Sequence, residues 1–288
     1  MSILKRGYGQ ESLYDYHEGK IKKGLDIGLE DFDKHLRFKQ GQFVMINGLD
    51  NVGKTLFIVW YFLCLSMKHG LKWCIWSGEN EAWQIKRDLM SMYEGVKFNE
   101  IDIKRITVLM DYIDNWFLFV DNRNLYSHKE ILKLFKSQEV NGCLIDPFTG
   151  MNHDRKINQF ERNYQFCNDV REFCNKTGKT VYVNTHPQTE ASRRVYANDN
   201  TLKGFVQPPK KSDTEGGQSF ANRCDDFLTI HRMTNHPEMW MLTEVHVRKV
   251  KDKETGGDIT FLDDPLRLDY NSGLGFTLGG HNPLKKLR

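Results

Sequence analysis

The segment at residues 48–55, with the sequence GLDNVGKT, constrains the fold of this chain more than any other feature. An apolar run that predicts a strand precedes it, and a longer apolar run that predicts a helix follows it. In this setting the backbone N–H groups of a glycine-containing turn meet the N-terminus of a helix, where they bind phosphate groups. The segment therefore predicts a nucleoside-triphosphate site at the edge of an α/β sheet.

Two side chains of this segment have expected roles. Lys54 would reach the β- and γ-phosphates, and Thr55 would place its hydroxyl on Mg²⁺, which offsets the charge that develops during phosphoryl transfer. The alternative is a chance glycine turn before a helix, and the strand and helix on either side argue against it. The nucleotide-binding residues expected here are Gly48, Asp50, Asn51, Val52, Gly53, Lys54, Thr55 and Leu56.

Three further strand ends supply polar side chains. Asp146 ends an apolar strand and would orient a magnesium-bound water, although an ordinary strand-terminal aspartate has the same pattern. Glu79 follows another strand and is the expected general base, because ligands of open α/β sheets bind at the carboxyl ends of strands. Glu81 is better interpreted as the first-turn acid of the next helix. His186 follows a third strand, as either a γ-phosphate sensor or a structural histidine.

Strand and helix patterns alternate through most of the chain. The strands predicted in this part are 42–46, 72–77, 105–109, 116–120, 142–145 and 180–184, and the helices are 55–69, 81–93, 127–137 and 159–176. After Asp225 the predicted strands are 227–232, 240–250, 259–262 and 266–270, with polar turns and no helix between them. The order predicts an α/β fold with a mainly parallel sheet, helices on both faces and antiparallel C-terminal strands.

The length of 288 residues favours one principal domain. We expect it to span residues 25–275, between a polar arm or linker at 1–24 and a tail at 276–288. The arm could dock on a neighbouring subunit. The polar stretch at 193–217 is too long for an ordinary connection and predicts a functional loop.

Composition excludes several classes of protein. A hydrophobic content of 39% is neither fibrous nor disordered, and the net charge of +3 means that any affinity for nucleic acid must come from local basic patches. The longest apolar run, 56–67, is shorter than the roughly 20 residues that span a bilayer. No pair of cysteines has the C-x-x-C spacing, so a reduced cytoplasmic protein without a membrane partner is expected. The six cysteines are Cys64, Cys74, Cys143, Cys167, Cys174 and Cys224.

These motifs, in this order, resemble the RecA-like ATPase domain of superfamily 4, the DnaB-like replicative helicases, and in style the phage primase-helicases and mitochondrial Twinkle. The resemblance covers residues 24–275. Residues 28–33 resemble the entry segment of the family and residues 77–80 its second motif. Residues 216–225 resemble the glycine-led motif that lines the central channel.

The resemblance implies an ATP-hydrolysing DNA helicase whose subunits form a ring, expected to be a hexamer, with ATP bound between subunits. Arg232 and Tyr270 fall where the phage enzymes sandwich the nucleotide base, and a guanidinium plane and a phenol ring both suit stacking. Single-stranded DNA would thread the ring. Its candidate contacts are Lys203, Lys210, Lys211 and Asn222, the last at a position where the family usually has Gln. The alternative for the three lysines is that they are ordinary solvated charges.

One basic turn departs from the family pattern. Where the family has a Lys and, two residues on, an Arg that reaches the γ-phosphate of the neighbouring subunit, this sequence has Lys251 and Lys253. Lysine keeps the charge but loses the planar fork, which predicts weaker transition-state stabilisation or a different finger such as Arg248. The alternative is a solvated basic turn.

The cysteines lack the spacing of zinc ligands, and the arm at 1–24 is too short for a primase domain, so we expect a separate primase or loader. The resemblance is to replication proteins of phages and bacteria. A RecA-like recombinase or regulatory DNA-binding ATPase without unwinding activity is the alternative function. A nucleotide-binding assembly protein with little turnover is a third.

Overall fold

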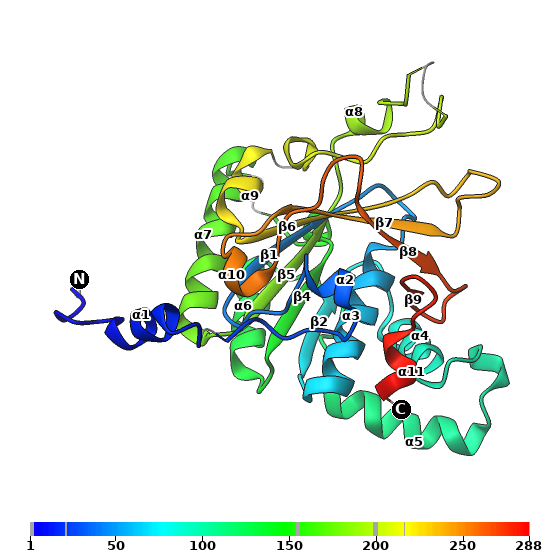
Figure 1. Cartoon of the computed structure of the whole chain (residues 1–288), viewed down its shortest axis with the longest axis horizontal. Coiled ribbons are helices and arrows are strands. Elements are labelled where there is room, and N and C mark those ends of the chain that lie inside the picture. The colour runs from blue at the N-terminus through cyan, green and yellow to red at the C-terminus, as the bar shows by residue number, and fades with distance from the viewer. Residues whose placement is uncertain (1–2, 21, 154–155, 198–200, 216, 288) are drawn as a thin grey trace.

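The computed structural model describes residues 3–20, 22–153, 156–197, 201–215 and 217–287. Across these residues the chain forms a nine-stranded sheet with the order β3-β2-β4-β5-β1-β6-β7-β8-β9. The strands from β3 to β6 in this order pair in parallel, and those from β6 to β9 pair antiparallel. Figure 1 shows helices on both sides of the sheet. The expected α/β fold, with a mainly parallel sheet that ends in antiparallel strands, is confirmed.

The central strands of the sheet are buried along their whole length. Successive side chains of a strand point to opposite faces, so β1 directs Val44 to one face and Met45 to the other. Both faces therefore need a covering layer. The strands are β1 Phe43–Asn47, β2 Trp73–Ser77, β3 Phe117–Phe119, β4 Gly142–Asp146, β5 Thr180–Thr185, β6 Asp226–Arg232, β7 Leu242–Lys249, β8 Leu266–Tyr270 and β9 Phe276–Thr277.

Two groups of helices supply these layers. Apolar side chains of α3, α4, α5 and α11 form one core cluster with the sheet, and those of α6, α7 and α9 form the other. The longer helices are α1 Gln10–His17, α3 Lys54–His69, α4 Ala82–Glu94, α5 Ile103–Trp116, α6 His128–Ser137, α7 Gln159–Thr177 and α9 Gln218–Arg223. The short ones are α2 Glu30–Asp33, α8 Thr189–Ser192, α10 Lys253–Gly256 and α11 Pro283–Leu287.

Helix α3 is the central element of the first cluster, and its first two residues are the last two of the phosphate segment, residues 48–55. It begins after Gly53, whose φ is 90°, and ends at Gly70, whose φ is 70°, a conformation that glycine adopts without steric cost. Between these ends Phe62 stacks on Trp73 of β2, with the ring centroids 3.7 Å apart. An apolar helix buried in this way fixes the phosphate segment rigidly against the sheet.

Residues 105–109, predicted to be a strand, lie within helix α5. The run contains three consecutive β-branched residues, which locally favour a strand. Instead the carboxylate of Asp102 accepts a hydrogen bond from the backbone N–H of Lys104 at 2.8 Å and caps a helix. Leu109 and Ile113, four residues apart, are fully buried on one face of that helix. The prediction was wrong because burial at helical spacing outweighs local propensity.

Residues 259–262, also predicted to be a strand, form no regular element. Thr260 bonds to the sheet: its N–H donates to the carbonyl of Val247 at 3.0 Å, and its hydroxyl accepts from the N–H of that residue at 3.1 Å. Phe261 and Leu262 are exposed, so the apolar run has no core to pack against. The short helix α10 lies in the same connection, where no helix was expected.

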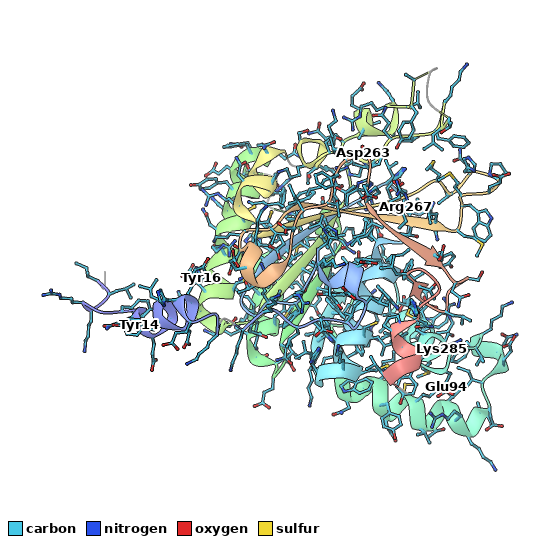
Figure 2. All side chains as sticks on the ribbon, in the orientation of Figure 1. Tyr14, Tyr16, Glu94, Asp263, Arg267 and Lys285 are labelled. Carbon is cyan, nitrogen blue, oxygen red and sulfur yellow. The ribbon has the colours of Figure 1, made fainter. Side chains whose placement is uncertain are left out.

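The two ends of the chain differ in their packing. Helix α1 lies within the expected N-terminal arm and has no buried residue. Figure 1 shows it projecting away from the sheet, and Figure 2 shows Tyr14 and Tyr16 upon it. At the other end, the stretch expected to be a tail carries β9 and α11, and Leu284 of α11 is fully buried in the core cluster of α3.

All six cysteines are buried and free, as expected for small apolar packing groups. Burial raises the pKa of the Cys74 and Cys167 thiols to about 12, so both stay protonated at neutral pH. Among the helices that the structure describes, none has the length and apolar character needed to cross a bilayer.

A group of buried polar side chains lies on β6 and β7. Nε2 of His246 is 3.2 Å from Oε2 of Glu244, and His231 is paired with Glu244 in the strand register. Burial lowers the pKa of His231 to about 4 and also lowers the pKa of His246 from its ordinary value. Both rings are therefore neutral in the folded protein near pH 7.

We expect the free energy of unfolding to fall as the pH falls from about 6.5 to about 4, because the unfolded chain then binds protons that folded His231 does not. The loss at the acid end is up to about 3 kcal/mol from this residue. Urea unfolding at several pH values in this window measures it. His231→Asn should flatten the dependence, whereas His17→Asn, which removes an exposed ring, should leave it unchanged. An equal slope in all three proteins would contradict the expectation.

Candidate active site

Parallel strands bring the candidate site residues to one edge of the sheet. β2 and β4 are in register to their ends, where Ser77 lies opposite Asp146. β1 and β5 likewise run side by side to their last residues. The phosphate segment follows β1, Glu79 follows β2 and His186 follows β5, so residues far apart in the sequence meet here.

The backbone of the phosphate segment is held in a tight turn. A Cβ at Gly48 would lie 2.5 Å from the carbonyl oxygen of Ile230, so a side chain has no space there. The ammonium of Lys54 folds over the turn and donates to the carbonyls of Gly48 at 2.8 Å and Leu49 at 2.9 Å. Burial lowers the pKa of Lys54, against the opposite effect of nearby carboxylates. The turn thus holds a cation above a helix N-terminus, which suits a phosphate ligand.

Asp146 collects hydrogen bonds from three elements. Its Oδ2 accepts from the Thr55 hydroxyl at 2.8 Å and from the Ser77 hydroxyl at 3.3 Å, and its Oδ1 accepts from the Asn184 amide at 2.7 Å. Burial raises the pKa of this carboxyl. Ser77 and Asn184 were not singled out from the sequence. The sequence feature that could have indicated each of them is a polar residue at the end of an otherwise apolar strand.

The oxygen atoms around Asp146 fit Mg²⁺, which prefers hard oxygen ligands and usually retains phosphate and water ligands. The hydroxyl of Thr55 and the carboxylate of Asp146 are already within hydrogen-bonding distance of each other. In the described part of the chain no three His, Cys, Asp or Glu side chains gather to hold a metal by themselves. The Thr55 hydroxyl and the Asp146 carboxylate supply two oxygen groups, and this pair suits a metal that arrives with a nucleotide.

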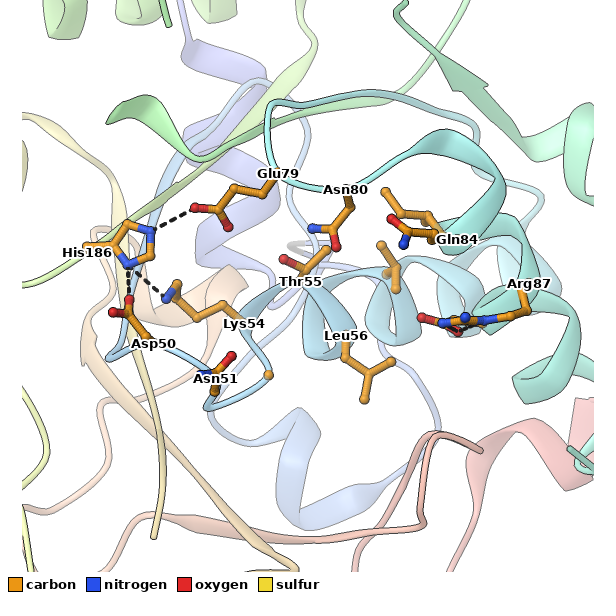
Figure 3. A pocket seen from close by; sticks show the side chains of 14 residues that line it. Asp50, Asn51, Lys54, Thr55, Leu56, Glu79, Asn80, Gln84, Arg87 and His186 are labelled. Atoms are coloured by element: carbon orange, nitrogen blue, oxygen red, sulfur yellow. Dashed lines mark hydrogen bonds and ion pairs between the residues drawn. The ribbon is translucent and has the colours of Figure 1, made fainter. Parts of the chain in front are cut away.

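His186 links the phosphate segment to Glu79, as Figure 3 shows. Its Nδ1 lies 2.8 Å from Oδ1 of Asp50, and its Nε2 lies 3.3 Å from Oε1 of Glu79. The ammonium of Lys54 is 3.4 Å from the same Nδ1. The imidazole thus stands between two carboxylates from different elements, which position in the sequence alone did not reveal.

Lys54, Thr55, Glu79 and His186 line a cavity of about 530 Å³, wide enough for a nucleotide, whereas Asp146 is bonded to Thr55 and is not among the lining residues. Its walls include Asp50, Asn51 and residues 53–56 of the turn, together with a stretch of helix α4. The α4 residues Gln84 and Arg87 were not expected at the site. The feature of the sequence that could have indicated them is their position in the first turns of the helix that follows Glu79.

Arg232 and Tyr270 lie together beside the phosphate turn. The guanidinium carbon of Arg232 is 4.5 Å from the ring centroid of Tyr270, and its Nη2 donates to the carbonyl of Asn51 at 3.0 Å. Arg232 ends β6 and Tyr270 ends β8, and β7 lies between these two strands in the sheet. Their contact therefore could not be inferred from the sequence. The two expected base-stacking groups now stack on each other.

The expected finger residues lie outside this cavity, within intrachain contacts. The ammonium of Lys251 is 3.1 Å from Asp225, a carboxylate that also binds Arg171. The ammonium of Lys253 is 3.0 Å from Asp258, and both side chains of that pair are exposed. Arg248 is half-buried, and burial lowers its pKa, so it points into the protein and not toward solvent.

The expected DNA-contacting residues lie on exposed or half-exposed positions. Lys203 forms an isolated bridge with Tyr196 inside the long polar stretch, and Lys211 begins a turn of 3-10 helix. Lys210 precedes that turn, and its backbone N–H donates to Asp213 at 2.6 Å. Asn222 lies on α9 with an exposed side chain, while Gly216, at the head of the glycine-led motif, lies outside the described residues.

No family model matches the chain. In sequence it is 23% identical over 264 residues to the Twinkle homolog protein, chloroplastic/mitochondrial, of Arabidopsis thaliana, a match that covers 85% of this chain and 36% of that protein. The chain thus spans about a third of the length of this relative.

Solved structures with the same fold include one described as an ATPase domain, with a TM-score of 0.75 at 16% identity over 95% of this chain and 99% of that one. They also include a DnaB-like replicative helicase, described with its interactions with primase, with a TM-score of 0.73 at 14% identity. That match covers 96% of this chain and 67% of that one. The chain therefore has the RecA-like fold of the ATPase domains of DnaB-like replicative helicases.

Proposed function

We propose that this chain is an ATP-dependent DNA helicase that couples ATP hydrolysis to movement along single-stranded DNA. The observation that carries the proposal is the convergence of Lys54, Thr55 and Glu79 on one nucleotide-sized cavity, with Asp146 bonded to Thr55 at 2.8 Å directly beside it. It occurs in a fold that the chain shares with the ATPase domains of replicative helicases. The distant sequence relationship to a Twinkle homolog supports the same assignment.

ATP binds with its phosphates on the turn that precedes α3. The backbone N–H groups of the turn and the N-terminus of α3 face the phosphates, and the ammonium of Lys54 turns from the carbonyls of Gly48 and Leu49 to the β- and γ-phosphates. Arg232 and Tyr270, which now stack on each other beside Asn51, separate to admit the base between them. Because both side chains of this stack are half-exposed, their separation costs little free energy.

The chain supplies the ligands for a magnesium ion from two elements. Thr55 would hold the ion through its hydroxyl, and Asp146 would hold a water bound to it. When bound with ATP, Mg²⁺ neutralises the charge that develops on the phosphate oxygens. Ser77 and Asn184 keep the Asp146 carboxylate in place, since each donates a hydrogen bond to one of its oxygens.

Glu79 acts as the general base. Its carboxylate accepts a proton from the attacking water while the new P–O bond forms and the bond to the ADP oxygen breaks, giving ADP and phosphate. Its position on the turn after β2 faces the end of the phosphate segment. His186 orients the Glu79 carboxylate and contacts the γ-phosphate, so it responds to the presence of that group.

A neighbouring subunit completes the site. Lys251 and Lys253 lie outside the cavity of their own chain, so we assign them to the γ-phosphate of the next subunit in a ring, expected to be hexameric. Lys203, Lys210, Lys211 and Asn222 contact the DNA strand in the channel. The solved DnaB-like helicase is described with primase, and we propose a separate primase or loader as a partner here as well.

The experiment that tests this function measures ATP hydrolysis with and without single-stranded DNA. We expect stimulation by the DNA, and electron micrographs with a non-hydrolysable ATP analogue should show closed rings. Filaments would favour a RecA-like recombinase. Monomers without DNA stimulation would favour a nucleotide-binding assembly protein, an alternative that lysines at the finger positions also favour.

A further inference from the structure

We infer that Asp50 is a positioning residue: it fixes the ring of His186 and, through that ring, the carboxylate of Glu79. The inference rests on the proposed ATP hydrolysis. It also predicts that Asp50 weakens nucleotide binding, so that this one residue has opposite effects on affinity and turnover.

The contacts of His186 fix the orientation of its ring. The peptide backbone of His186 is fixed, because its carbonyl accepts a hydrogen bond from the N–H of Glu215 at 2.8 Å. The ring is free to rotate about its side-chain bonds unless its nitrogens are bound. Asp50 lies 2.8 Å from Nδ1 and directs Nε2 toward Glu79, which is 3.3 Å away. The Lys54 ammonium is 3.4 Å from the same Nδ1, so Asp50 is the nearer of two groups that set where the second ring nitrogen points.

The position of Glu79 depends on this ring. Its side chain is 52% exposed, and the carboxylate contacts His186 at the cavity wall. A carboxylate that is half exposed on a turn samples several rotamers, whereas a general base has to stay within hydrogen-bonding distance of one water. The chain of contacts from Asp50 to His186 to Glu79 thus holds the base in one place.

The negative charge of Asp50 opposes the binding of a triphosphate. Residues 48–55 contain one acidic side chain, in a turn that binds a triphosphate. At a separation of about 6 Å and an effective dielectric constant of about 40, the repulsion between two unit charges weakens binding about tenfold. A carboxylate in this turn therefore weakens nucleotide binding. Its role in orienting His186 explains why the turn carries a carboxylate despite this effect.

The fold does not depend on Asp50. Its side chain is 81% exposed, and an ion pair with so much solvent contact contributes little to stability. Variants at this position should therefore fold, which makes their kinetics interpretable.

The test uses steady-state ATP hydrolysis by the full chain with single-stranded DNA. Asp50→Ala should lower KM about tenfold, because the repulsion is gone, and should lower kcat about tenfold, because the His186 ring loses its nearest contact at Nδ1. Asp50→Asn should lower KM to a similar extent but keep kcat within about twofold, since its amide oxygen still accepts a hydrogen bond from Nδ1–H. Asp263→Ala, a substitution in the exposed turn before β8, is the matched control and should change neither constant.

A double-variant cycle separates positioning from simple disruption. In a His186→Ala background, Asp50→Ala should cause no further loss of kcat and should still lower KM. An unchanged kcat in Asp50→Ala, or additive losses in the double variant, would overturn the inference while wild-type hydrolysis leaves the proposed function intact. Failure of the wild-type protein to hydrolyse ATP would instead overturn the proposed function, and the inference with it.

Discussion

Replacing Lys54 by alanine should abolish ATP hydrolysis, with a loss of about a thousandfold in kcat/KM. The ammonium is the charged donor closest to the phosphate turn, and in that water-poor setting a single donor to a developing charge contributes two to three orders of magnitude. Phosphate release in the presence of Mg²⁺ and single-stranded DNA measures the loss.

The control for this variant is Lys72→Ala, because Lys72 is an exposed lysine just before β2 and away from the cavity. It should retain wild-type activity. Thermal melting should show that both variants are folded. Hydrolysis at the wild-type rate in Lys54→Ala would refute the assignment of residues 48–55 as the phosphate site.

Glu79→Gln should lower kcat by about two to three orders of magnitude while nucleotide affinity stays close to that of the wild type. The amide keeps the shape of the side chain but cannot take a proton from water, and general bases contribute roughly 10²- to 10⁴-fold. Single-turnover hydrolysis together with binding of a fluorescent ATP analogue separates the two effects.

Glu81→Gln is the matched control for this second variant. Glu81 lies two residues away and caps α4, where its side chain and that of Gln84 form a capping box. Its substitution should affect kcat less than about twofold. A Glu79 variant that retains the wild-type rate would favour the assembly-protein alternative, in which little hydrolysis takes place.

Much of the fold could be predicted from the sequence because the signals are local. The phosphate segment, with a strand before it and an apolar helix after it, needs only neighbouring residues to be recognised. The alternation of strands and helices then gives the parallel part of the sheet. The errors at 105–109 and 259–262 have one cause: local pattern does not reveal which face of a segment finds a core.

The site could be predicted only in part, for a related reason. Glu79, Asp146 and His186 were recognisable as polar residues at strand ends, and the parallel register brings those ends together. The contact of His186 with Asp50 joins residues more than a hundred positions apart and has no local signal. The resemblance implied that Arg232 and Tyr270 lie on either side of a nucleotide base, but their contact with each other was not expected.

The completion of the site by a second subunit stays a prediction. The ammonium of Lys253 forms an exposed ion pair with Asp258, which costs little to break, whereas Lys251 binds a carboxylate that Arg171 also binds. Lys253 is therefore the freer of the two to reach a neighbouring γ-phosphate.

The measurement that tests the central claim most directly is strand displacement from a forked DNA duplex whose single-stranded arms have free ends, onto which a ring can thread without a loader. With ATP and Mg²⁺, the wild-type protein should release the displaced strand, and Lys54→Ala and Glu79→Gln should not. Forks with only a 5′ or only a 3′ arm long enough to bind the protein would also give the polarity of movement. DNA-stimulated ATP hydrolysis by the wild-type protein without any strand release on either fork would contradict the assignment of helicase activity.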